Sequence, residues 1–474
     1  MNRFSRRLRV FLAQPTNADR FGLIAAAFIA GLVAVGYSTI YRIAEHFCVH
    51  LFHVHPYWLI AAAPICFVAG WWVVDRTQVL AGGSGIPQVM ASIELQEQRR
   101  DHGVIRNLLG LRVAVVKVVS SLLCVLGGGV VGREGPTIQV SASLFYAIGR
   151  RVRSFTSAVA LDSWTLAGAS AGMAAAFNTP LGGIVYAIEE LASKHFNRVR
   201  TAVLSAVLVS GLVSQWLVGS YLYLGYPRVG SVGLSTIPGA FVLGIVGGLI
   251  GGGFGAALFS GQNWLKARIK WRRVSTGFAI AFLCGLALVI FRLFDPRALG
   301  PGNRLISDIL AGNTTASGEL VAVRFGSTVV SYLSGCAGGI FAPSLAIGAS
   351  LGSWMASWWG GANAVLFALL GMIAVLTGVT RAPFTSFVLM VEMTDRHSAI
   401  LPMMLTAMVA LASARVFGSH SFYERAKHAM LHDIGPLPVP ATSVAPSKPL
   451  PVAPAPSKPP VTIDTANPVT RIDS

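Results

Sequence analysis

The residue with the clearest chemical potential is Glu134, which lies between two apolar segments in the run Gly132-Arg133-Glu134-Gly135-Pro136. Glycines flank the acid and a proline follows, and proline is favoured in the first turn of an α-helix. The N–H groups of a first turn have no intrahelical acceptor, and together with the helix dipole they attract anions. The sequence therefore predicts a titratable acid at an anion-attracting helix start, a pairing that favours ion chemistry.

Two more Gly/Pro-rich segments interrupt apolar sequence in the same way. Gly83-Ser84-Gly85-Ile86-Pro87 precedes Glu134 in the chain, and Gly339-Ile340-Phe341-Ala342-Pro343 follows it. Glycine permits unusual backbone and proline favours a helix start. We expect the three segments to aim amides and the Ser84 hydroxyl at one anion. Partial charges suit transport, because the ion must bind weakly enough to leave again.

The elements that must position these segments are membrane helices. The 474 residues are 54% hydrophobic and 12% charged, about half the charged fraction usual in soluble domains. Several apolar runs reach the ~20 residues that a spanning helix needs, and others are shorter or interrupted by Gly and Pro, as in tilted or broken helices. We predict an all-α polytopic membrane protein, because strands would alternate apolar and polar residues instead.

The net charge of +18 is carried by basic clusters beside the apolar runs, such as those at 3–9 and 266–273. This distribution follows the positive-inside rule and predicts cytoplasmic N- and C-termini. Nucleic acid is not an expected partner, since the charges lack interleaved aromatic residues. The five cysteines have no paired or metal-ligand spacing. A loose histidine group at 46–55 favours an interfacial loop over a metal site, so no metal is expected.

The chain divides into a basic N-terminal segment (1–20), a membrane domain (21–434) and a Pro-rich tail (435–474) predicted to be disordered. The membrane domain shows an internal repeat with approximate halves 21–220 and 238–417. Gly132 and Gly339 are separated by 207 residues. Glu189 and Glu392, each nine residues after a proline, are separated by 203 residues. Matching broken segments in two halves predict a binding site at their interface.

The three Gly/Pro segments resemble the three signature motifs of the CLC chloride channel/transporter family, and Tyr423 in the run 418–423 matches too. The resemblance covers roughly 21–432. It implies a CLC-type inverted-repeat fold of many tilted and broken helices. It also implies a homodimer surrounded by membrane lipid, with one pathway in each subunit. The lack of an appended nucleotide-binding module favours a bacterial inner-membrane protein.

The resemblance also implies a role for individual residues. Ser84 and Tyr423 would bind the anion with their hydroxyls, helped by the backbone amides of Ile340 and Phe341. Glu134 would be the gating glutamate, which occupies an anion position when ionised and swings away when protonated. Ser84, where some relatives have proline, suggests chloride over nitrate. The remaining motif residues would support this site: Gly83, Gly85, Arg133 and Gly135.

Two positions outside the motifs match the family as well. Glu190 matches the acid that accepts protons from the cytoplasmic side in family exchangers, with Glu189 as a matching neighbour. From the residues alone, Glu190 could equally be a helix-end acid paired with the basic segment 194–200. Lys117 matches a buried lysine, which is expensive inside an apolar run. The carboxylate that pairs with it in some relatives is absent, so it is expected to be neutral or satisfied by carbonyls.

The expected function is exchange of chloride for protons, with these ions as the transported species and no cofactor. The first alternative is a passive chloride or anion channel, or a fluoride or nitrate exchanger, with the same fold. A remote alternative is an intramembrane serine hydrolase using Ser170, which would need a histidine such as His195. Close helix packing explains the small residues at 167–176 better, so an enzyme is not expected.

Overall fold

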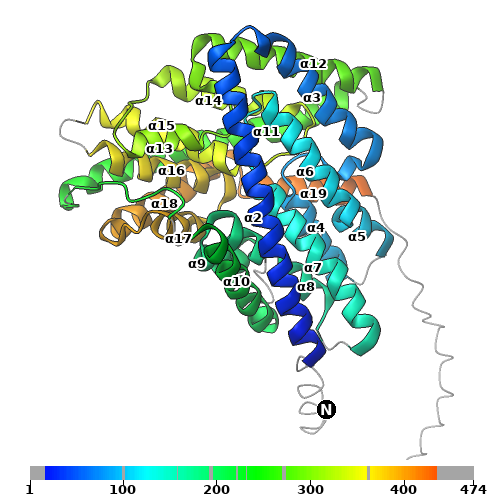
Figure 1. The fold of residues 1–474 in the computed structure, drawn as a ribbon. Coiled ribbons are helices and arrows are strands. Elements are labelled where there is room, and N and C mark those ends of the chain that lie inside the picture. The colour runs from blue at the N-terminus through cyan, green and yellow to red at the C-terminus, as the bar shows by residue number, and fades with distance from the viewer. Residues whose placement is uncertain are drawn as a thin grey trace, which may run out of the picture. The chain divides into compact units, whose positions relative to one another are not determined.

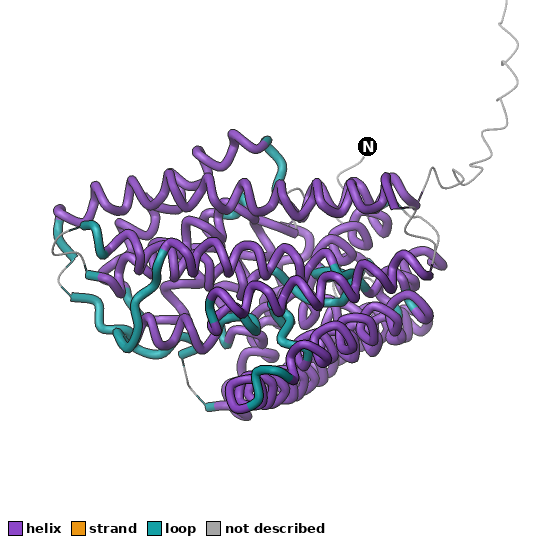
Figure 2. Tube along the Cα trace, turned by 90° about the horizontal axis from the view of Figure 1, so that it is seen from above, coloured by secondary structure: helices purple, strands orange, loops and turns teal. Residues whose placement is uncertain are grey.

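A computed structural model describes residues 17–98, 102–156, 159–191, 196–219, 222–230, 232–269, 274–359 and 363–434. Of the expected N-terminal segment, residues 1–16 lie outside these ranges, and so does the whole expected tail 435–474. Within the described ranges the structure is helical (Figures 1 and 2). The extended pairings in these ranges are two isolated bridges, Gly83 with Ala337 and Gly132 with Gly339.

Helices of very unequal length make up both halves of the domain. The first half contains α2 (Asn17–Val54), α3 (Trp58–Thr77), α4 (Ile86–Glu97), α5 (His102–Leu109), α6 (Leu111–Leu126), α7 (Glu134–Thr156), α8 (Leu161–Phe177), α9 (Pro180–Tyr186) and α10 (Phe196–Val218). The second half contains α11 (Ile237–Ile269), α12 (Val274–Phe294), α13 (Asn303–Leu310), α14 (Gly318–Leu333), α15 (Phe341–Ala356), α16 (Ala364–Thr380), α17 (Pro383–Thr394) and α18 (Ile400–Ala414), and α19 (Phe422–Ile434) follows.

The helices of the two halves recur in the same order. α6 and α14 are both 16 residues long, and α8 and α16 are both 17 residues long. α8 ends at Asn178 and α16 ends at Arg381, both in the left-handed region with φ of 56° and 61°. A proline opens the next helix two residues later in each case, at Pro180 and Pro383. The chain therefore folds as two helical repeats, as expected.

Seven helices in the described ranges are long and apolar enough to cross a membrane. In each of these helices, at most half of the residues in the most apolar 18-residue stretch are buried. Large apolar faces therefore point away from the rest of the protein. α16 is shorter but buried almost all round, as expected for a helix that is apolar on every side. It packs against α15, α11 and α18 (Figure 1). The protein is an all-α membrane protein whose central helices are partly broken.

Candidate functional site

Backbone hydrogen bonds join the three Gly/Pro segments to one another. The Gly83 N–H donates to the Cys336 carbonyl (3.1 Å), and the Gly338 N–H donates to the Gly83 carbonyl (3.0 Å). Gly132 and Gly339 exchange two hydrogen bonds, of 2.6 and 2.7 Å. The segment before α15 is thus paired on one side with the segment before α4 and on the other with the segment before α7. This pairing brings three helix starts together.

Two glycines are required where the segments touch. A Cβ atom on Gly135 would lie 2.5 Å from the Ser84 carbonyl oxygen and 2.6 Å from its Oγ. Gly85 has φ of 100°, in the left-handed region, and a Cβ there would lie 3.0 Å from the Gly135 carbonyl oxygen. The backbone of the acidic motif therefore packs directly on the serine motif, with no room for a side chain between them.

The four groups predicted to bind an anion are all buried in this region. The Ser84 hydroxyl is buried. Tyr423, which is 1% exposed, lies beside Ser84. Ile340 and Phe341 form the start of α15, where the first intrahelical donor is the Ser344 N–H (3.0 Å to the Ile340 carbonyl). Their own amides therefore have no intrahelical acceptor.

Glu134 is the first residue of α7, yet its carboxylate lies against the start of a different helix. The side chain is fully buried and lies next to the Gly132 backbone and the Ala342 amide, in the first turn of α15. Its Oε1 accepts a long hydrogen bond from the Tyr223 hydroxyl (3.4 Å). A carboxylate thus occupies an anion-attracting position on the same helix start that carries the Ile340 and Phe341 amides.

Tyr223 belongs to the loop between α10 and α11 and has no sequence motif that marks it. Its hydroxyl lies 3.1 Å from the Asn303 Oδ1, and the side chain of Glu45 on α2 lies beside Asn303. The Arg133 guanidinium lies 5.8 Å from the Tyr223 ring centre. The Phe177 ring contacts both the Tyr223 ring and the Phe341 ring, with centroid distances of 5.1 Å. This cluster covers Glu134 with aromatic and polar side chains.

Lys117 is fully buried on α6 and donates to backbone carbonyls of the serine motif. Its Nζ lies 2.8 Å from the Gly83 carbonyl oxygen and 3.3 Å from that of Gly82. Gln88, in the first turn of α4, donates to the same Gly82 carbonyl (2.8 Å). The ammonium group therefore stabilises the turn that presents Ser84.

Arg324 on α14 follows Lys117 by 207 residues, the same separation as Gly132 and Gly339. It is fully buried, and its guanidinium donates to the carbonyls of residues 297–301 at 2.8–3.4 Å. Gly300 and Gly302 in this loop have φ of 68° and 100°, close to the 66° and 100° of Gly83 and Gly85. Each half thus has a buried basic side chain that donates to a Gly-x-Gly turn. The sequence interpretation missed this residue, although the repeat offset applied to Lys117 would have found it.

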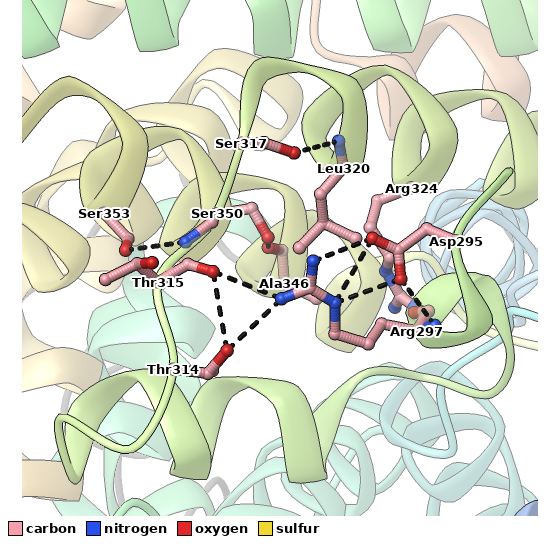
Figure 3. A network of polar contacts seen from close by, with 11 residues as sticks. Asp295, Arg297, Thr314, Thr315, Ser317, Leu320, Arg324, Ala346, Ser350 and Ser353 are labelled. Atoms are coloured by element: carbon pink, nitrogen blue, oxygen red, sulfur yellow. Dashed lines mark hydrogen bonds and ion pairs between the residues drawn. The ribbon is translucent and has the colours of Figure 1, made fainter. Parts of the chain in front are cut away.

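An ion pair fixes the start of the same loop (Figure 3). Arg297 Nη2 lies 2.8 Å from Asp295 Oδ2, and its Nη1 donates to Thr314 Oγ1 (3.3 Å). Partial burial raises the pKa of the Asp295 carboxyl, but hydrogen bonds and charge from Arg297 outweigh it and hold that pKa below its usual range. The Gly300 N–H then donates to the Gly128 carbonyl (3.0 Å), which connects this loop to the segment before Glu134.

Glu189 and Glu190 lie on a π-helical turn, Ala187–Leu191, and point to different surroundings. Glu189 accepts hydrogen bonds from the Phe384 N–H (3.2 Å) and the Thr385 N–H (2.7 Å) at the start of α17. Glu190 has a buried Oε1 with no hydrogen-bond partner among the described residues, and it lies near Tyr186 and Tyr423. The side chains of the basic segment 194–200 lie outside the described residues. An ion pair between Glu190 and this segment therefore stays an alternative.

Neither the hydrolase nor a metal site gains support. Ser170 is buried in α8 and donates to the Leu166 carbonyl of its own helix (2.8 Å), and His195 lies outside the described residues. Among the described residues, no three His, Cys, Asp or Glu side chains lie close enough to hold a metal ion.

Known proteins resemble this chain in sequence. The family model described as "Voltage gated chloride channel" matches residues 65–415. The H(+)/Cl(-) exchange transporter ClcA of Salmonella arizonae is 33% identical over 427 residues, which are 85% of this chain and 84% of the relative. The transporter of the same name from Salmonella paratyphi B is 32% identical over 448 residues, 89% of each chain.

Solved structures share the fold. A slow cyanobacterial Cl-/H+ antiporter superposes with a TM-score of 0.74 at 25% identity, covering 87% of this chain and 97% of that one. A CLC-type fluoride/proton antiporter gives a TM-score of 0.68 at 23% identity, covering 87% and 99% of the two chains. A eukaryotic CLC transporter gives 0.70 at 20% identity, covering 88% and 75%.

Proposed function

The chain belongs to the voltage-gated chloride channel family, and on that premise we propose that it is a secondary active transporter that exchanges chloride for protons. The observation that carries the proposal is the position of Glu134. Its carboxylate lies at the start of α15, beside amides that suit chloride equally well. A protonatable group that competes with an anion for one position couples the two ions. The protein is a transporter and not an enzyme, and it needs no cofactor.

In the proposed anion pathway, chloride binds to the hydroxyls of Ser84 and Tyr423 and to the N–H groups of Ile340 and Phe341. These donors carry partial charges, so they hold an anion without trapping it. Ionised Glu134 occupies the neighbouring anion position near the Ala342 amide. Protonation removes its charge, and the amides then favour chloride over the neutral acid. Gly83, Gly85 and Gly135 permit the close backbone contacts, Lys117 stabilises the serine turn, and Arg133 lies over the Tyr223 ring.

In the proposed proton pathway, Glu190 exchanges protons with the cytoplasmic side. Its Oε1 is buried and has no hydrogen-bond partner among the residues that the structure describes, which supports this role, because a structural acid at such a position would normally be hydrogen-bonded. Tyr186 is a neighbour of Glu190 and of Tyr423, and Tyr423 lies beside Ser84, so these two hydroxyls are the candidates for passing a proton towards the anion site. Glu189 holds the π-helical turn against α17 and so positions Glu190.

We further propose a homodimer in a bacterial inner membrane, with cytoplasmic termini and repeat halves at 21–220 and 238–417. Apolar side chains on α9, α10, α17 and α18 are strongly exposed, which supports either subunit or lipid contact at that face. The most exposed of them are Leu401, Trp216, Leu212, Leu181, Leu208 and Phe384.

The rival functions are passive anion conduction and exchange of fluoride or nitrate. The purified protein in liposomes separates these functions from the proposed one. With equal pH inside and outside the vesicles, an inward chloride gradient should drive protons out of them. This proton movement should require chloride. Chloride flux without proton movement would indicate a channel. Proton movement with fluoride or nitrate, but not with chloride, would reassign the anion.

A further inference from the structure

We propose that a basic cavity at the start of α6 binds the phosphate group of an anionic phospholipid. The cavity has a volume of about 900 Å³ and lies where α5, the start of α6 and the later part of α7 meet. It is separate from the anion pathway and is independent of whether the protein exchanges protons.

The charge of the cavity wall has one sign. Four of the lining residues are arginines, and the described lining contains neither Asp nor Glu. The arginines come from three elements: Arg106 on α5, Arg112 on α6, and Arg150 and Arg151 on α7. Guanidinium groups match phosphate oxygens in geometry and charge, and basic pockets between membrane helices suit anionic headgroups.

The backbone adds donors of the same kind. Residues 110–113 line the cavity, and Gly110 is the N-cap of α6. The first-turn amides of this helix have no intrahelical acceptor and carry the positive end of its dipole. Tyr146 also lines the cavity. Its hydroxyl is buried and lies close to Arg150, whose guanidinium is 5.8 Å from the Tyr146 ring centre.

The outer face of α6 indicates a lipid and not a free phosphate. Leu111, Val115 and Val119 follow one another at four-residue intervals, so they lie along one side of the helix. Their exposed fractions are 51%, 63% and 40%. This apolar strip begins at the cavity and runs along the candidate span Gly103–Leu126. An acyl chain can lie on the strip while the phosphate stays among the arginines.

Native mass spectrometry of the detergent-purified protein tests the proposal, with dioleoylphosphatidylglycerol and dioleoylphosphatidylcholine added in parallel. The wild type should bind the anionic lipid preferentially, and the lipid should raise the thermal unfolding midpoint. R106Q/R150Q should bind it about tenfold more weakly, since each arginine near a headgroup contributes modestly. R106K/R150K should retain most of the preference. R228Q is the matched control, because Arg228 is an exposed arginine in the loop 222–230.

Equal binding of both lipids by the wild type, or an unchanged preference in R106Q/R150Q, would overturn the proposal. Inorganic phosphate is the third arm of the test. Stabilisation by phosphate together with no preference between the lipids would also overturn it, because the site would then be one for free phosphate. The single variants R106Q and R150Q provide the same comparison in proteins with only one change, should the double variant be too unstable to purify.

Discussion

Glu189 and Glu392 cap each other's neighbouring helices. Glu189 accepts two amide hydrogen bonds at the start of α17, and Glu392, which lies on α17, accepts the Leu181 N–H (3.0 Å) and Gly182 N–H (2.7 Å) at the start of α9. The two acids are separated by 203 residues and stand at equivalent positions of the two repeats. Such a reciprocal contact joins the halves and holds the turn that carries Glu190.

This relationship predicts a stability effect. E392Q should lower the thermal unfolding midpoint in detergent, because a carboxylate at a helix start contributes about 0.5–2 kcal/mol. D433N is the control, since Asp433 is an exposed acid near the end of α19 and lies at no helix start. Equal midpoints for E392Q and D433N would show that the Glu392 cap does not stabilise the fold.

Tyr223 should tune the pH dependence of chloride flux. Its hydroxyl donates to Glu134 and stabilises the ionised acid, so Y223F makes protonation easier. The half-maximal flux should therefore move to higher pH. The charged neighbours Arg133 and Glu45 are unchanged in this variant. In an E134Q background Y223F should have no such effect, and a persisting shift would mean that Tyr223 acts elsewhere.

We predict that Lys117 increases the affinity for chloride by stabilising the turn that presents Ser84. K117M removes the Nζ donor from the Gly82 and Gly83 carbonyls, which keep their hydrogen bonds from Gln88 and from the Gly338 N–H, and one such lost hydrogen bond costs about 0.5–1.5 kcal/mol. Chloride binding measured by calorimetry should weaken about tenfold as the turn loosens. K266M is the comparison, because Lys266 forms an exposed ion pair with Asp433. Unaltered chloride affinity in K117M would contradict this role.

Glu190 should be needed for protons and not for chloride. In liposomes E190Q should retain chloride flux and lose proton movement. E319Q is the control variant, since Glu319 is an exposed acid on α14 that contacts neither Glu190 nor its neighbours in the described residues, and it should retain coupling. Proton movement by E190Q at the wild-type rate would remove Glu190 from the proton pathway and restore its interpretation as a surface acid.

The sequence predicted the helical membrane fold, the repeat and the central segments because their signals are local. Glycine and proline mark broken helices directly, and the equal spacing of Glu189 and Glu392 after prolines is visible in the chain. The three Gly/Pro segments were expected to approach one point, and in the structure the segment that contains Ser84 lies against those before α7 and α15.

The remaining contacts depend on long-range packing that leaves no local pattern. Tyr223 lies in a loop, and only the folded chain brings its hydroxyl to Glu134 and Asn303. The capping roles of Glu189 and Glu392 were not expected either, because their acceptor function depends on which helix start lies opposite. Arg324 is different, since the repeat offset alone would have indicated it.

The central claim is that Glu134 couples the ions by competing with chloride, and E134Q in liposomes tests it most directly. A permanently neutral side chain cannot act as an anion or carry a proton. The variant should therefore pass chloride at every pH between about 4 and 8 without moving protons, whereas E319Q should behave as the wild type. Continued chloride-driven proton movement in E134Q would contradict the account.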